Sequence, residues 1–175
     1  MRKSITRKSI TLAGLLGALL ALAFSISLGH AASTPASDPM QEGARHFQRA
    51  DYKGAVAAWQ PMAIKGHPVA QNNLGILYLD GKGVKQDTSE AVRYLSLSAA
   101  TGSSLGQNNL GGLYREGKGV PRDYSKAAQW FTASAAQGNA AAHRDALWGR
   151  MTPAAQKQAK DMTAACKSQA YKGCR

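Results

Sequence analysis

An internal repeat constrains this chain more than any other feature of its sequence. The segment 69–104 recurs as 105–140, a shift of 36 residues, and 18 of the 36 aligned positions are identical. A repeat of this length is typical of a small unit of secondary structure that cannot bury its apolar face alone. Because stacked units bury that face against their neighbours, we expect a solenoid with one continuous core.

Each copy has the pattern of two helices joined by a glycine-rich turn. The stretches NNLGILY and NNLGGLY place leucine and tyrosine on one face at helical spacing. GKGV follows in both copies, and its glycines suit a turn with positive φ. Asp87 and Asp123 then stand where they can cap a second helix, and Gly102 and Gly138 where they can end it. The sequence therefore predicts an all-α fold of helix hairpins.

Partial copies flank the two full repeats. Residues 41–68 are predicted to form an N-terminal half repeat without the GKGV turn, similar to a tetratricopeptide hairpin. Within it, Pro61 is expected to kink the second helix or to end it early. Residues 141–175 are predicted to be a degenerate repeat followed by a capping helix, with Thr152 as the N-cap and Pro153 in the first helical position.

Residues 1–31 have the order of a secretory signal peptide. Basic residues precede a long apolar run, and cleavage is expected after Ala31 or Ala32. An uncleaved membrane anchor is the alternative, because the run is long enough to span a bilayer. Residues 32–40, rich in proline and serine, are predicted to be a flexible linker. We therefore expect a periplasmic or secreted protein without stable membrane insertion after cleavage.

The two cysteines, Cys166 and Cys174, stand close together near the C-terminus. Export places them in an oxidising compartment, so we predict a disulfide between them. Such a small loop would stabilise the fold by about 2–3 kcal/mol. The spacing is not CxxC and no matching ligand pair accompanies it, which disfavours a zinc or redox role. We predict no metal site.

The repeat pattern AxxxLGxLYxxGxGVxxDxxxAxxWxxxAAxxGxxxA resembles the consensus of the Sel-one-like repeat, a relative of the tetratricopeptide repeat. The two full copies carry nearly every signature position, and with the partial copies the resemblance covers roughly residues 43–150. It implies a right-handed α/α superhelix that acts as an adaptor or scaffold for protein complexes. It also implies a protein or peptide partner and no cofactor.

Six positions on the first helices lie about a turn apart, away from the face that carries the consensus leucine and tyrosine. In solenoids of this kind such positions tend to line the concave surface, so they are candidates for partner contact, with a merely solvated surface as the alternative. The six are Asn72, Ile76, Leu79, Asn108, Gly112 and Arg115.

No catalytic site is predicted. Glu90 opens a helix and Glu116 stands beside a turn, so neither placement suggests a pair of carboxylates in a cleft. The GKGV turns follow no strand and lack the spacing of a phosphate-binding loop. The tyrosines and tryptophans recur at repeat positions expected to pack between helices, which favours a core role over a stacking platform for sugars or bases.

The formal net charge of +12 includes four positive charges in residues 1–31, so most of it belongs to the rest of the chain. A basic surface attracts acidic proteins, anionic glycans and lipid headgroups alike. The leading hypothesis is an exported solenoid adaptor that binds a protein or peptide, with no nucleic-acid partner. The alternative is an envelope protein that binds or processes peptidoglycan or another glycan. An effector delivered to a host cell is a third possibility.

Overall fold

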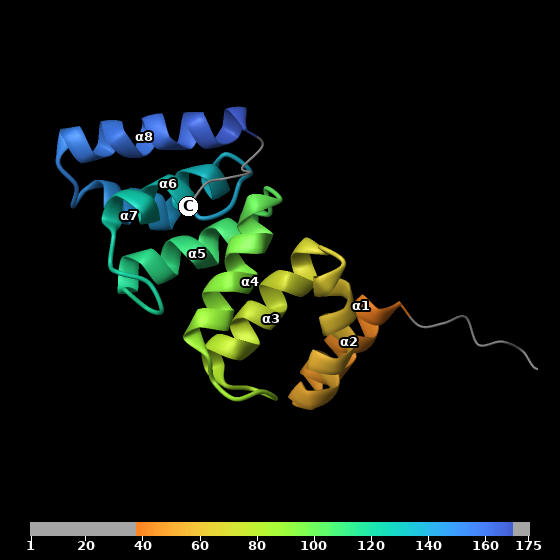
Figure 1. The fold of residues 1–175 in the computed structure, drawn as a ribbon. Helices are drawn as coiled ribbons and strands as arrows, with labels where there is room; N and C mark the ends of the chain where they lie inside the picture. The colour runs from red at the N-terminus through yellow and green to blue at the C-terminus, as the bar shows by residue number, and fades with distance from the viewer. Residues whose placement is uncertain (1–37, 170–175) are drawn as a thin grey trace, which may run out of the picture. The chain divides into compact units, whose positions relative to one another are not determined.

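The computed structural model describes residues 38–169, which form eight α-helices and no strand (Figure 1). The predicted signal peptide, most of the predicted linker and Cys174 lie outside these residues. In chain order the helices are α1 (Pro39–Gln48), α2 (Tyr52–Ile64), α3 (Pro68–Asp80), α4 (Thr88–Ala100), α5 (Ser104–Glu116), α6 (Tyr124–Ala135), α7 (Ala141–Trp148) and α8 (Pro153–Ser168).

The helices pack in the order of the chain. α1 pairs with α2, α3 with α4 and α5 with α6, and each hairpin also contacts the next through α2 with α3 and α4 with α5. After the third hairpin, α6 packs against both α7 and α8 (Figure 1). This arrangement confirms the predicted all-α solenoid of helix hairpins.

Local signals set the ends of the repeat helices. The carboxylate of Asp87 accepts hydrogen bonds from the backbone N–H groups of Ser89 and Glu90, at 2.9 and 3.1 Å. Asp123 caps α6 through the N–H of Lys126 at 2.9 Å. These bonds satisfy backbone donors that a helix start otherwise leaves without a partner. The predicted capping roles of both aspartates are confirmed.

The GKGV turns also dock on the preceding hairpin. Gly83 and Gly119 have φ of 73° and 70°. A Cβ at Gly83 would overlap the backbone of Tyr52, and one at Gly119 would lie 2.8 Å from the carbonyl oxygen of Thr88. Tyr52 and Thr88 each open the second helix of the preceding hairpin. Glycine is therefore required there for two reasons, the backbone conformation and the close approach.

Three clusters of buried side chains form the core, and each is shared between hairpins. Trp59 of α2, Leu74 of α3 and Tyr94 of α4 belong to the first cluster. Trp130 of α6 packs in the second with residues of α4 and α5. Most aromatic side chains are thus packing elements, as predicted, although Tyr124 is 47% exposed.

Two boundaries differ from the sequence-based expectation. α2 continues three residues past Pro61, so this proline does not end the helix. Pro61 lies in the last turn, where its missing N–H removes one helical bond while its own carbonyl still accepts from the N–H of Lys65 at 3.2 Å. α1 begins at Pro39, two residues inside the predicted linker, because Asp38 caps it through the N–H of Met40.

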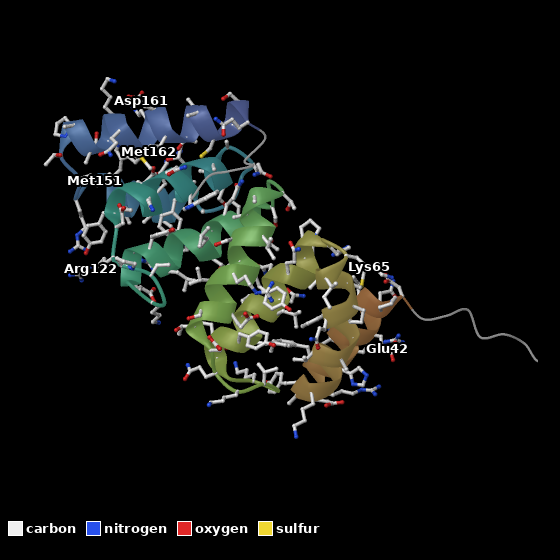
Figure 2. The ribbon with its side chains drawn as sticks, in the orientation of Figure 1. Glu42, Lys65, Arg122, Met151, Asp161 and Met162 are labelled. Carbon is white, nitrogen blue, oxygen red and sulfur yellow. The ribbon has the colours of Figure 1, made fainter. Side chains whose placement is uncertain are left out.

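α8 begins as the sequence predicts, with Thr152 as its N-cap and Pro153 in its first turn. Ala159 is fully buried against α6, whereas Lys157 and Asp161 are exposed and form an ion pair of 2.7 Å. Figure 2 shows Asp161 on the outer side of α8. The helix therefore presents one apolar face to the solenoid and one polar face to solvent.

Candidate functional site

Three hollows lie along the first helices of successive hairpins. The N-terminal hollow has a volume of about 270 Å³ and lies between α1, α2 and α3. The central hollow, about 320 Å³, lies mainly between α3 and α5, and the basic hollow, about 510 Å³, lies between the end of α5, the loop that follows it and α7. We call the surface that contains them the first-helix face.

Shared residues join the hollows into one path. Ile76 lines both the N-terminal and the central hollow. Arg115, Glu116 and His143 line both the central and the basic hollow. The path therefore runs along α1, α3, α5 and α7 without a break in its lining.

Five of the six candidate contact residues line the central hollow. They are Ile76, Leu79, Asn108, Gly112 and Arg115. Helical spacing was enough to place them on one surface, because residues three and four apart on a helix are neighbours.

Asn72 corrects the prediction of an exposed contact residue. Its exposed fraction is 3%, and its Oδ1 accepts a hydrogen bond of 2.8 Å from Nδ2 of Asn109 on α5. α5 covers this position because it packs directly against α3. Asn108, one repeat later, stays half-buried, and its Oδ1 lies 2.8 Å from Nδ1 of His143 on the short helix α7.

Gly112 opens the central hollow. It occupies the same repeat position as Ile76, and a Cβ placed on it would meet no atom within 4 Å. The neighbouring Gly111 differs, because its Cβ would lie 2.9 Å from the ring of Phe131. Packing therefore requires glycine at Gly111 but not at Gly112.

The basic hollow carries an excess of positive charge. Four basic side chains and one carboxylate line it, a formal excess of three; the basic residues are Arg115, Lys118, Arg122 and Arg150. The carboxylate of Glu116 forms ion pairs with Lys118 at 2.8 Å and with Arg115 at 2.9 Å. Hydrogen bonds from these two cations lower the pKa of Glu116 below its ordinary value of 4.5.

Several residues of these hollows were not predicted from the sequence. Phe47, 39% exposed, lines the N-terminal hollow, and it lies in the partial repeat where no contact position was assigned. Lys118 and Arg122 belong to a loop for which the sequence predicts only a turn, and Figure 2 labels Arg122 there. The basic residues that recur between Arg115 and Arg122 are a sequence signal that could have found this hollow.

Within residues 38–169, no three His, Cys, Asp or Glu side chains gather closely enough to hold a metal ion. None of the helices formed by these residues combines the length and apolarity needed to cross a membrane.

Residues 68–103 and 104–139 each match the family model of the Sel1 repeat. Among solved structures, the chain is similar to c5321, a protective antigen of uropathogenic Escherichia coli with an SLR fold, at 33% identity and a TM-score of 0.70. That match covers 76% of this chain and 31% of the antigen. A Sel1 repeat protein from Oxalobacter formigenes is also similar, at 29% identity and a TM-score of 0.54, covering 57% of this chain and 41% of that one. No curated protein matches the sequence.

Proposed function

This protein is a member of the Sel1-like repeat family, and from that premise we propose that it is an exported adaptor that binds a segment of another protein on its first-helix face. The family suggests a role in protein–protein interaction. The chain spans less than half the length of either of the two solved proteins named above, so any role taken from them is part of this proposal.

The continuity of the three hollows is the observation that carries this proposal. Each hollow alone is small, but shared residues connect them along four first helices. A continuous path of this kind suits an elongated polypeptide better than a compact small molecule, and repeat solenoids commonly use extended surfaces in this way. Phe47, exposed in the N-terminal hollow, adds an apolar contact of the kind that protein interfaces favour.

The sequence supports the proposed setting. Residues 1–31 have the order of a secretory signal peptide, and the similar E. coli protein is described as a protective antigen. On these grounds we propose that this chain acts in the bacterial envelope or outside the cell. N-terminal sequencing of the purified protein tests the export step. A start at Ala32 or Ser33 would support cleavage, and a start at Met1 would contradict it.

In-cell crosslinking of a C-terminally tagged protein, followed by mass spectrometry, tests the adaptor role. The test variant combines Ile76→Asp with Arg115→Glu on the first-helix face. The matched control combines Ile64→Asp with Lys65→Glu at the end of α2, where both residues are exposed; Lys65 is labelled in Figure 2. We expect a recurrent protein partner that the control retains and the test variant loses. An unchanged set of crosslinked proteins would contradict binding on this face.

The basic hollow favours one alternative, binding or processing of an anionic envelope glycan such as peptidoglycan. Its excess of positive charge would attract such a polymer without requiring the apolar hollows. Sedimentation with purified peptidoglycan across a salt series separates the two functions, because purely charge-driven binding weakens steeply with salt. Sedimentation that persists in the test variant and disappears at high salt would favour the glycan.

A further inference from the structure

Gly112 leaves a hollow in the first-helix face, although packing does not require a glycine at this position. We propose that this central hollow is a specificity pocket for one large apolar side chain of the partner, and that carboxylates of the same partner segment contact the adjoining basic hollow. This inference rests on the proposed function and names the chemistry of the segment that the first-helix face would bind.

The glycines inside the described helices show why Gly112 is unusual. A Cβ on any of the others would come closer than 3.0 Å to a neighbouring side chain or backbone atom; these are Gly43, Gly54, Gly75, Gly106 and Gly111. At Gly112 a Cβ would meet nothing within 4 Å. Glycine within a helix is destabilising relative to alanine, so this position carries a cost without any gain in packing.

The preceding repeat carries a large apolar residue at the position of Gly112. That residue is Ile76, and its side chain lines both the N-terminal and the central hollow. Without such a side chain on α5, the central hollow stays open between Ile76 and Phe131. The difference between the two copies therefore creates one pocket along an otherwise repetitive surface.

The walls of the central hollow suit an apolar side chain. Leu79, Leu95, Leu113 and Phe131 line it together with Ile76. Its polar lining is already engaged within the protein. Asn109 donates to Asn72, and Asn108 pairs with His143 at 2.8 Å. A volume of about 320 Å³ has room for one side chain such as leucine, methionine or phenylalanine.

The charged residues of the basic hollow indicate which residues of the partner should flank the apolar side chain. Within residues 38–169, Glu116 pairs with Arg115 and Lys118, and no carboxylate forms an ion pair with Arg122 or Arg150. Arg115 lines both hollows, so a segment with its apolar residue in the central hollow would place its neighbours beside these arginines. Charge complementarity therefore points to aspartate or glutamate next to the apolar residue.

Selection from a random peptide library displayed on phage tests this inference with the protein as purified from expressing cells. We expect the selected peptides to combine one large apolar residue with adjacent aspartate or glutamate. Their affinities would then be measured by fluorescence anisotropy with synthetic peptides, at low and high salt. The variants are Gly112→Ile, which reproduces the residue of the preceding repeat, and Gly112→Ala, which fills less of the hollow. Ile64→Asp, at the exposed end of α2 and outside the three hollows, is the control.

We expect Gly112→Ile to weaken binding by about tenfold or more, the scale on which an apolar pocket discriminates. Gly112→Ala should weaken binding less, and Ile64→Asp should bind as the unmodified protein does. Arg122→Ala combined with Arg150→Ala should weaken binding and reduce its salt dependence. Circular dichroism would verify that each variant is folded. Because a Cβ at Gly112 has open space, a loss of binding with retained helicity reports on the pocket.

Failure of this inference is distinguishable from failure of the proposed function. Peptides that lose binding to the Ile76→Asp and Arg115→Glu variant but bind Gly112→Ile normally would overturn the pocket and leave the adaptor surface standing. Peptides without acidic enrichment would overturn the assignment of the basic hollow. If no peptide is enriched, or if all variants bind alike, both proposals fail.

Discussion

Asn109 donates a hydrogen bond from Nδ2 to Oδ1 of Asn72 over 2.8 Å, and this bond joins the first helices of two successive repeats. Asn72 is only 3% exposed, so its side chain depends on partners within the protein. Each repeat carries two adjacent asparagines on its first helix. These residues therefore contribute to the stacking of hairpins as well as to the surface.

Removing this bond should destabilise the solenoid. We expect Asn72→Ala to lower the free energy of unfolding by about 1–2 kcal/mol, because the amide of Asn109 loses its acceptor in a partly buried place. Urea unfolding of Asn72→Ala, Asn109→Ala and the double variant measures the coupling, expected at about 0.5–1.5 kcal/mol. A coupling near zero would show that the bond does not contribute to stability.

The adjacent glycines of α5 should respond in opposite directions to alanine. Gly112→Ala is expected to raise the free energy of unfolding by about 0.5–1 kcal/mol, since alanine favours the helix and its Cβ meets nothing. Gly111→Ala is expected to lower it by about 1–3 kcal/mol, because the new Cβ presses on the buried ring of Phe131.

Guanidinium unfolding followed by circular dichroism checks both values in one helix. Gly75→Ala offers a second comparison, because Gly75 occupies the position of Gly111 in the preceding repeat and its Cβ would press on Leu95. Destabilisation by Gly112→Ala would contradict the assignment of Gly112 as free of packing constraint, and stabilisation by Gly111→Ala would contradict the packing constraint at Gly111.

Protonation of Asp51 should make the free energy of unfolding depend on pH in the acidic range. A hydrogen bond from the N–H of Gly54 and another with His46 lower the pKa of Asp51 below its ordinary value of 3.8. The folded state therefore favours the carboxylate. The stabilising effect of this carboxylate is present above the ordinary pKa of 3.8 and is lost as the pH falls through the lower pKa of the folded state. His46 faces it at 2.7 Å, and Glu42 lies 4.0 Å from the same imidazole.

The Asp51→Asn variant keeps an N-cap acceptor but removes the titration. We expect its stability to fall less steeply with acid below about pH 4 than that of the unmodified protein. Urea unfolding across this pH range provides the curves, and an NMR titration of the Asp51 carboxyl reports its pKa directly. A titration midpoint at or above the ordinary value would contradict the prediction.

The disulfide between Cys166 and Cys174 stays a prediction, because Cys174 lies outside the described residues. Cys166 is 8% exposed, and the amide of Gln129 lies 2.7 Å from its sulfur, so burial would slow labelling of the native protein whatever its redox state. Alkylation in denaturant without reductant is therefore the decisive measurement. We expect neither cysteine to react, and modification of both would disprove the disulfide. Replacing both with serine should cost about 2–3 kcal/mol.

Much of the fold follows from local sequence signals. Asp87 and Asp123 cap the helices that they precede, and the GKGV glycines adopt positive φ in both copies. The 36-residue shift adds the information that hairpins must stack, because neither copy can bury its own apolar face. The order of the helices, the turns and most of the core could be predicted on these grounds.

The candidate site was predictable only in part. Helical spacing placed Ile76, Gly112 and Arg115 on one surface, but it gave Asn72 and Asn108 the same role. Their environments differ because Asn72 is covered by α5, whereas the helix that contacts Asn108 is the shorter α7. Contacts across a full repeat decide such differences, and the local pattern around each asparagine is the same.

The sequence by itself determined the hairpins, their caps and the repeat that stacks them, since those features depend on neighbours a few residues away. Only the tertiary structure decided that Phe131 occupies the space beside Gly111, while the space beside Gly112 stays open. It also decided that Arg122 and Arg150 line the same basic hollow. The physical reason is that burial and charge density arise from segments a repeat apart, which meet only when the hairpins pack.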